Sequence, residues 1–181
     1  MIISESANII NSLGIESKTK YSIEIINEDD FKELEVFLKN NKLPILFLGE
    51  GTNIIPPDFF NGVVIRSFCK NINFRKDINI LNVDSGVNWH ELVKFCISNN
   101  INGFENLSLI PGSVGAAPIQ NIGAYGAEIS TLIESINYFD INTHELKTIE
   151  NHECNFEYRN SSLKNNSFFI TSINFKTNLV N

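Results

Sequence analysis

The stretch Ile45-Leu46-Phe47-Leu48-Gly49-Glu50-Gly51-Thr52-Asn53 determines the interpretation of the fold. Its first four residues are wholly apolar, which is typical of a short strand buried in a parallel sheet. The two glycines that follow permit a tight turn and a close approach of the backbone to a phosphate. Because ligands of α/β units bind beyond the carboxyl ends of such strands, residues 49–53, the first loop, are either a phosphate-binding loop or a turn that only connects two strands.

The residues before this strand predict a strand and a helix. Ser22–Ile26 is expected to be the strand, and Asn27 is expected to cap a helix that runs to about Asn40. The strand, the helix and the strand after Pro44 would form a right-handed βαβ unit, to which Val63–Arg66 adds a third strand. Residues 1–67 are therefore assigned to a first lobe. Its helix should place four apolar residues on one face: Phe31, Leu34, Phe37 and Leu38.

The remaining residues, 68–181, are assigned to a second, larger lobe. One helix is expected from Trp89 to Asn99, capped by Asn88, with Leu92, Val93, Cys96 and Ile97 on its apolar face. Short strands joined by tight turns predict antiparallel pairing. The expected strands are Ile80–Asp84, Ile133–Asp140, Leu146–Glu150 and Phe168–Phe175.

Composition and charge restrict the function. The 181 residues have the apolar and charged content of an ordinary globular protein, and no apolar run approaches the ~20 residues of a membrane-spanning helix. The net charge of -7 argues against a nucleic-acid surface. It does not argue against an anionic cofactor, since backbone N–H groups can hold a pyrophosphate. Three scattered cysteines fit free thiols in a reducing cytoplasm, and no cysteine and histidine share a metal-ligand spacing, so no metal site is expected.

A second loop carries the strongest signal: Pro111-Gly112-Ser113-Val114-Gly115-Ala116-Ala117-Pro118-Ile119-Gln120-Asn121-Ile122-Gly123-Ala124-Tyr125-Gly126. It lies within a segment, 103–126, that has too much Gly and Pro for regular structure. Small residues leave the backbone open to an anionic or flat ligand, while Gln120, Asn121 and Tyr125 could orient a heterocycle. The alternative is an irregular segment in which small residues serve packing. The length of the segment favours a functional loop.

These two loops resemble those of the UDP-N-acetylenolpyruvoylglucosamine reductase (MurB) family. The resemblance extends to the run Cys154-Asn155-Phe156-Glu157-Tyr158-Arg159-Asn160-Ser161, to Asn11-Ser12-Leu13-Gly14 and to Asn88-Trp89-His90. It covers nearly the entire chain, and the sixteen residues of the second loop are far more specific than any glycine triplet.

The resemblance implies an α+β fold: a two-lobed FAD-binding domain of the vanillyl-alcohol-oxidase-like (PCMH) type, with a small βαβ lobe and a larger, mainly antiparallel lobe. It also implies non-covalent FAD lying between the lobes, NADPH as the reductant, and a UDP-sugar as substrate. The implied reaction reduces UDP-N-acetylenolpyruvoylglucosamine to UDP-N-acetylmuramate in the cytoplasm, for peptidoglycan synthesis and hence for cell-wall biogenesis, cell shape and cell division. The oligomeric state stays open.

Residue roles follow from the same resemblance. Arg159 matches the catalytic arginine of the family, whose fixed guanidinium can neutralise a carboxylate as charge develops on it. Tyr125 and Tyr158, with Arg159, are expected to contact substrate or nicotinamide. The expected FAD contacts are Gly49, Glu50, Gly51, Thr52 and Asn53 of the first loop, with Pro111, Gly112, Ser113, Gly115, Ala116, Asn121, Gly123 and Ala124 of the second.

The chain departs from the family in one respect. Members of the family continue into a third, substrate-binding domain that supplies a proton-donating serine and a late glutamate, and neither can be assigned here. Two hypotheses therefore remain: an enzyme of the reductase class that is complete only with further sequence, and a flavin-binding module without turnover. A flavin oxidase acting on another substrate is a third, weaker alternative. We expect these 181 residues alone to bind FAD without efficient substrate reduction.

Overall fold

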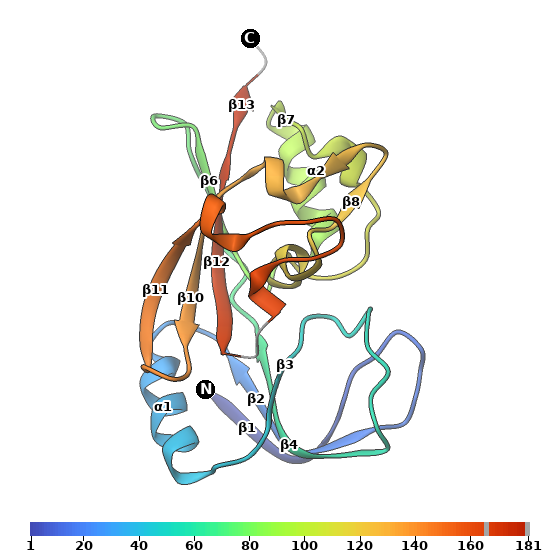
Figure 1. Cartoon of the computed structure of the whole chain (residues 1–181), viewed down its shortest axis with the longest axis vertical. Helices are drawn as coiled ribbons and strands as arrows, with labels where there is room; N and C mark the ends of the chain where they lie inside the picture. Colours follow the sequence, from blue (N-terminus) through green and yellow to red (C-terminus); the bar gives the residue numbers. More distant parts are fainter. Residues whose placement is uncertain (165–166, 180–181) are drawn as a thin grey trace. The chain divides into compact units, whose positions relative to one another are not determined.

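The computed structural model of the chain describes residues 1–164 and 167–179 (Figure 1). They form two compact units, Met1–Cys69 and the residues from Lys70 onward. The expected boundary lay two residues earlier, and the last two residues of the expected second lobe lie outside the described ranges. Each unit has its own sheet, and the α+β class predicted from the sequence is confirmed.

The first unit is built on a four-stranded sheet in the order β1-β2-β4-β3. The helix α1 connects β2 to β3, and both strands run parallel to β4, which lies between them. The strand, helix and strand of the prediction are thus present, but the third predicted strand separates the other two. The fourth strand, β1, was not expected and pairs antiparallel with β2 at the edge. The bounds are β1 Ile2–Asn8, β2 Lys18–Ile25, β3 Ile45–Phe47 and β4 Phe59–Ser67.

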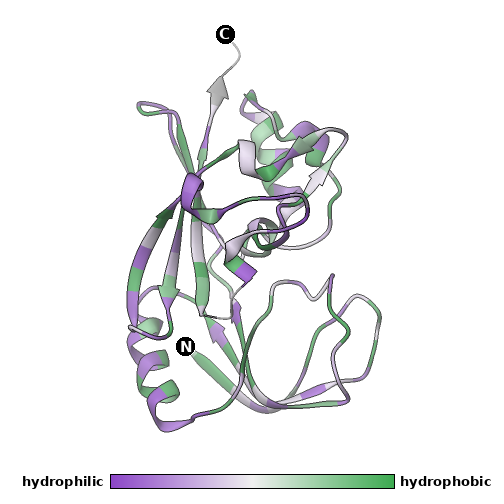
Figure 2. Cartoon of the chain, viewed as in Figure 1, coloured by the Kyte–Doolittle hydropathy of each residue, from purple (hydrophilic) through white to green (hydrophobic). Residues whose placement is uncertain are grey.

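Helix α1 spans Asp30–Asn40 and begins later than expected. The side chain of Asn27 accepts a hydrogen bond from the N–H of Asp30 (3.2 Å), while the Asp30 carboxylate accepts one from the N–H of Ile26 (2.7 Å). These bonds close a separate turn ahead of the helix. The apolar face is as predicted, with Phe31, Leu34 and Leu38 buried and Phe37 half-buried. In Figure 2, helix α1 shows hydrophobic (green) and hydrophilic (purple) residues in alternation along its turns.

The second unit is built on a five-stranded sheet in the order β11-β10-β12-β6-β5, in which all neighbours are antiparallel. Four of the strands confirm the prediction, and β5 was missed. Two short strand pairs, β7 with β13 and β8 with β9, complete the unit. The bounds are β5 Ile72–Arg75, β6 Ile80–Asp84, β7 Ile101–Asn102, β8 Gly123–Ala124, β9 Ala127–Glu128, β10 Ile133–Asp140, β11 Glu145–Glu150, β12 Phe168–Lys176 and β13 Asn178–Leu179.

Helix α2 spans Trp89–Ser98, and its predicted cap is confirmed, since Asn88 Oδ1 accepts a hydrogen bond from the N–H of Glu91 (3.1 Å). The expected apolar face was wrong at one position, because Ile97 is 52% exposed. Successive helical residues are about 100° apart, and Ile97 falls beside the buried stripe that Trp89, Leu92, Val93 and Cys96 form. Neither α-helix of the described ranges has the length and apolar composition that a membrane span requires.

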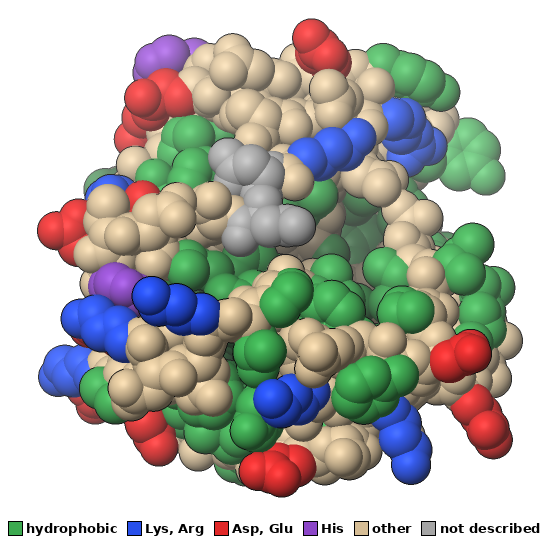
Figure 3. All heavy atoms as spheres, turned by 60° about the horizontal axis from the view of Figure 1, so that its bottom comes forward, with side chains coloured by type: hydrophobic (Ala, Val, Ile, Leu, Met, Phe, Trp, Pro, Cys, Tyr) green, Lys and Arg blue, Asp and Glu red, His purple; other side chains and the backbone are tan. Residues whose placement is uncertain are grey.

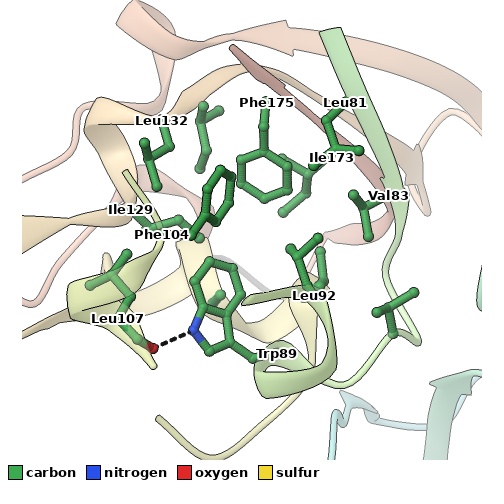
Figure 4. Packing of buried hydrophobic residues seen from close by; sticks show 14 of the residues in the cluster. Leu81, Val83, Trp89, Leu92, Phe104, Leu107, Ile129, Leu132, Ile173 and Phe175 are labelled. Atoms are coloured by element: carbon green, nitrogen blue, oxygen red, sulfur yellow. Dashed lines mark hydrogen bonds between the residues drawn. The ribbon is translucent and has the colours of Figure 1, made fainter. Parts of the chain in front are cut away.

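The core of the second unit fixes the segment that leads into the second loop (Figure 4). Phe104 packs on Trp89 and Phe175 with ring centroids 6.2 and 5.4 Å away. Trp89 Nε1 donates a hydrogen bond of 2.8 Å to the carbonyl oxygen of Leu107. Such aromatic pairs contribute about 0.5–1.5 kcal/mol each beyond the burial of their area. The start of the loop is therefore held by α2 and by the sheet.

The segment 103–126 contains more regular structure than predicted. It forms a short 3₁₀ turn at Glu105–Leu107, a 3₁₀ helix at Val114–Gln120 and the strand β8. The glycines and Pro118 disfavour a longer α-helix, but a 3₁₀ helix is compatible with short runs of this kind. It ends at Asn121, whose backbone is left-handed with φ 42°.

Candidate functional site

The first loop follows β3 and is held in place by two other segments of the first unit. Ser12 donates two hydrogen bonds to it, from its N–H to the carbonyl of Gly51 (3.0 Å) and from Oγ to that of Thr52 (3.4 Å). Arg66, near the end of β4, donates from Nε to the carbonyl of Gly49 (3.2 Å). The carbonyl groups of the loop are thus used by the protein itself.

Gly51 is required by packing within the chain. Its φ is 68°, and a Cβ there would lie 2.0 Å from the carbonyl oxygen of Ile10. The absence of a side chain at Gly51 therefore leaves room for the backbone of Ile10, and the fold requires glycine here whether or not a ligand binds. The N–H groups of Gly51, Thr52 and Asn53, however, make no hydrogen bond within the described ranges. Consecutive unpaired N–H groups around a left-handed residue are the arrangement that binds anions, so the loop fits a phosphate group.

The second loop presents fewer free donors than its composition suggested. The N–H groups of Val114, Gly115 and Ala116 donate to the carbonyls of Val87, Ser85 and Ser113 at 2.8, 2.9 and 3.1 Å. A Cβ on Gly115 would lie 2.5 Å from the Cβ of Ser85. At this position small size serves the packing of the chain.

Two donors at the start of the second loop stay open to a ligand. The N–H groups of Gly112 and Ser113 donate no hydrogen bond in the part of the chain that is described, and φ at Gly112 is 126°. The first turn of the second loop therefore offers two open donors that fit an anion.

Asn121, one of the expected FAD contacts, is buried, and its amide group is bonded within the protein. Nδ2 donates to Glu128 Oε2 (2.9 Å) and to the carbonyl of Glu157 (3.0 Å), and Oδ1 accepts from the N–H of Ser130 (3.1 Å). This side chain ties the second loop to the segment Cys154–Ser161 and leaves no donor for a ligand.

Arg159 lies on that segment and is joined directly to the second loop. Its guanidinium donates from Nη2 to the carbonyl of Gly123 (2.8 Å), and its side chain is otherwise exposed. The backbone at Arg159 is left-handed, with φ 52°, in a turn closed by hydrogen bonds between Glu157 and Asn160 (3.0 and 3.1 Å). The structure thus brings the expected catalytic arginine to the loop that was expected to bind the cofactor.

The two expected substrate-binding tyrosines are the most exposed large apolar residues described for the chain. Tyr125 is 89% and Tyr158 84% exposed. The carbonyl of Tyr125 accepts a hydrogen bond from Asn106 Nδ2 (3.3 Å), which connects the turn between β8 and β9 to the 3₁₀ turn before the second loop. Exposed aromatic rings beside a loop are available for contact with a ligand or with another part of a protein.

Sequence reasoning missed the residues that act through tertiary contacts. Arg66 was identified only as the end of a strand. Because the carboxyl ends of parallel strands lie at the same edge of a sheet, this position could have placed Arg66 beside the first loop. For Glu128 and Asn106 no signal existed in the sequence.

Two buried thiols of the described part of the chain have raised pKa values. Burial, with a smaller effect of the Glu105 carboxylate, raises the pKa of the Cys96 thiol to about 12, and burial chiefly raises that of Cys154 to about 11. Both thiols are therefore protonated and unreactive at neutral pH. The described ranges contain no group of three or more side chains that could hold a metal ion. Figure 3 shows acidic and basic side chains spread over the face that it presents.

A comparison with protein families matches residues 20–145 to a family described as "FAD binding domain". This match covers more than half of the chain. Together with the two-lobed α+β fold and the loop with open N–H groups, it defines the class: the chain belongs to the FAD-binding domain family.

Within this class, the chain is similar to UDP-N-acetylenolpyruvoylglucosamine reductases. It is 42% identical over 156 residues to the reductase of Shewanella sp. (strain MR-7), covering 85% of this chain and 46% of the relative. It is also 42% identical over 173 residues to that of Flavobacterium johnsoniae, covering 92% and 50%. These relatives confirm the resemblance stated from the motifs. The chain spans about half the length of the curated relatives it matches.

The fold is also that of a solved reductase. The crystal structure of UDP-N-acetylenolpyruvylglucosamine reductase (MurB) from Thermus caldophilus matches with a TM-score of 0.77, covering 97% of this chain and 63% of that one. The sequences are 21% identical, so this likeness supports the fold alone.

Proposed function

We propose that the chain binds FAD non-covalently and forms the flavin-binding part of an oxidoreductase that reduces UDP-N-acetylenolpyruvoylglucosamine to UDP-N-acetylmuramate with NADPH as reductant. The proposal is supported by the FAD-binding family and by the names of the relatives. NADPH and UDP-sugars are cytoplasmic metabolites, so the cytoplasm is the proposed compartment and peptidoglycan precursor synthesis the proposed process.

The FAD contacts are proposed at the groups that the chain leaves open. The N–H groups of Gly51, Thr52 and Asn53 in one unit, and those of Gly112 and Ser113 in the other, are unpaired in the described ranges. They are the donors that an anionic or polar part of the cofactor needs. The other predicted contacts, including Gly115 and Asn121, would act by shaping the loops.

The hydrogen bond from Arg159 to the carbonyl of Gly123 (2.8 Å) carries the functional proposal. It uses one donor and fixes the guanidinium beside the second loop, and the remaining donors are free to bind a carboxylate. FAD, when bound, supplies the hydride that adds to the terminal alkene carbon of the enolpyruvyl group. Arg159 would stabilise the negative charge that the substrate carboxylate gains as the hydride arrives, and a proton then completes the adjacent carbon. Tyr125 and Tyr158 would contact the substrate or the nicotinamide.

The experiment separates this proposal from its alternative, a flavin-binding module without turnover. The FAD-loaded chain is reduced by NADPH without oxygen, UDP-N-acetylenolpyruvoylglucosamine is added, and flavin reoxidation and product are followed. Because no proton donor is assigned in the described ranges and such a donor contributes about 10²–10⁴-fold, we expect slow, substrate-dependent reoxidation that forms UDP-N-acetylmuramate. If the flavin reoxidises at the same rate with and without substrate, the chain is instead a flavin-binding module without turnover.

Arg159 provides the residue-level test. Arg159→Ala should abolish the change that the substrate causes in the absorbance of bound FAD, and it should slow the reoxidation by about 10²–10³-fold. Arg159→Lys should restore these effects only in part, because an ammonium cannot make a bidentate contact with a carboxylate. Arg75→Ala is the control; it removes an exposed arginine whose ion pairing within the described ranges is limited to Asp77 (3.9 Å). Substrate binding that is equal in Arg159→Ala and the wild type would remove Arg159 from the site.

A further inference from the structure

We infer that Arg66 is a diphosphate-binding residue and that, with the first loop, it holds the diphosphate of the cofactor. This inference rests on the proposed binding of FAD and names the part of FAD that the first unit recognises. It adds a positively charged side chain to a loop for which the sequence predicted binding through backbone N–H groups and the polar side chains of Thr52 and Asn53.

The guanidinium of Arg66 is held beside the loop without a carboxylate partner. Nε donates to the carbonyl of Gly49 (3.2 Å), and the guanidinium carbon lies 5.1 Å from the centre of the Phe68 ring. No carboxylate of the described ranges lies within 4.0 Å of its nitrogens. The carbonyl and the ring fix the position of the guanidinium while its two Nη groups keep their donors. A planar guanidinium in this state is suited to bidentate contact with phosphate oxygens.

The loop beside Arg66 supplies the complementary donors. The N–H groups of Gly51, Thr52 and Asn53 are unpaired within the described part of the chain, and the loop also carries the acidic residue Glu50. An anion bound here would be repelled by that carboxylate at any distance within the Debye length, about 10 Å at 0.1 M salt. The positive charge of Arg66 beside the loop offsets this repulsion more effectively than the N–H groups alone.

A structural role is the alternative, in which Arg66 only closes the loop by its bond to Gly49. This role would make Arg66 important for stability but indifferent to phosphate. Comparing ligands that differ only in their phosphates separates the two roles, because FAD carries a diphosphate and riboflavin carries none.

The affinities of the 181-residue chain for FAD and riboflavin are measured by titration, with Tm recorded in parallel. Arg66→Gln is expected to weaken FAD binding about 10- to 100-fold, in line with the loss of a charge-assisted hydrogen bond, and to leave riboflavin binding unchanged. The FAD affinity of Arg66→Lys should lie between those of the wild type and Arg66→Gln. Added salt should weaken FAD binding more in the wild type than in Arg66→Gln. Salt screens the attraction between Arg66 and the diphosphate, and this attraction is present only in the wild type.

Arg75→Gln is the matched control, since it makes the same change in charge at an exposed arginine of the other unit. It should bind FAD as the wild type does. Equal FAD affinity in Arg66→Gln and the wild type would overturn the inference, and so would equal losses for FAD and riboflavin. A loss confined to UDP-N-acetylglucosamine, titrated into the FAD-loaded chain, would assign Arg66 to the substrate and also overturn it. A wild-type chain that binds no FAD would instead refute the proposed function, on which the inference rests.

Discussion

Leu109, Tyr125 and Arg159 share a backbone conformation that their side chains disfavour. Their φ angles are 61°, 49° and 52°, and all three side chains are exposed. The left-handed conformation costs an ordinary L-residue roughly 1–2 kcal/mol, and four of the other six non-glycine residues that adopt it are asparagines, which tolerate it. These three residues lie in or beside the second loop, whereas Ser6 and His144 adopt the same conformation elsewhere in the chain; such strain is common at functional sites.

Relieving this strain should stabilise the chain. Leu109 is 77% exposed, so Leu109→Asn loses little packing and gains a residue that adopts the left-handed conformation readily. We expect Tm to rise by about 2–4 °C, the equivalent of about 1 kcal/mol for a chain of this size. Leu146→Asn is the control, at an exposed leucine on the regular strand β11, and it should lower Tm slightly. A Tm that falls as much in Leu109→Asn as in the control would refute the interpretation that Leu109 is strained.

Roles could be predicted from motifs in the sequence for side chains such as Arg159, but not for side chains that act through a tertiary contact. Arg159 was predicted from its surrounding residues. The hydrogen bonds that the Asn121 side-chain amide donates to Glu128 and Glu157 involve residues that carry no recognisable motif. The same holds for the close packing of Gly115 on Ser85. A glycine that makes room for a ligand and one that makes room for the chain look the same in a sequence.

The hairpin of β10 and β11 shows how a single carboxylate fixes an element. Asp140 ends β10 and accepts hydrogen bonds from the N–H groups of Asn142 (2.9 Å) and Thr143 (3.4 Å) in the turn, and from Lys147 Nζ (3.0 Å) on β11. The hydrogen bond from Lys147 is the largest cause that lowers the pKa of the Asp140 carboxyl below its ordinary value of 3.8, and the turn N–H groups add to it against the effect of burial.

The hairpin should therefore lose stability in acid. Because the folded state lowers the pKa of Asp140, its contribution is present above the unfolded pKa and is lost as the pH falls through the folded pKa. Asp140→Asn should lower Tm by about 2–4 °C at pH 7, and this difference should vanish as the pH falls below 3.8 and through the lowered pKa of the folded state. Asp77→Asn, in the turn between β5 and β6, is the control, since within the described residues the exposed Asp77 makes a single ion pair, at 3.9 Å. A difference between Asp140→Asn and the wild type that stays constant with pH would contradict this role.

Elements were predictable where their pattern is local. The bounds of β6 and β10 agree with the prediction, because the apolar residues of each strand and the turns around it are visible in the sequence. The edge strand β1 was missed because its side chains are almost all exposed and carry no apolar alternation. The position of β4 between β2 and β3 is a choice among sheet topologies that strand patterns do not specify.

The family was recognised through the two loops and the segment Cys154–Ser161, because a loop of sixteen residues is far more specific than a short glycine motif. The α+β class, the family of FAD-binding domains and the similarity to the reductases followed from these segments. The two units present their open N–H groups on separate loops, and non-covalent binding of FAD by the 181 residues is the property on which the remaining proposals depend.

This binding is measured by adding FAD to the purified, flavin-free chain and recording absorbance and affinity, followed by acid precipitation. We predict that the chain takes up one FAD, that its Tm rises as expected for a ligand that binds only the folded state, and that the acid supernatant contains all of the flavin. A chain that is folded by its circular dichroism and thermal transition, yet binds no FAD at concentrations up to about 1 mM, equivalent to no more than about 4 kcal/mol of binding, would contradict the proposal. Flavin that remains with the precipitated protein would contradict the non-covalent attachment.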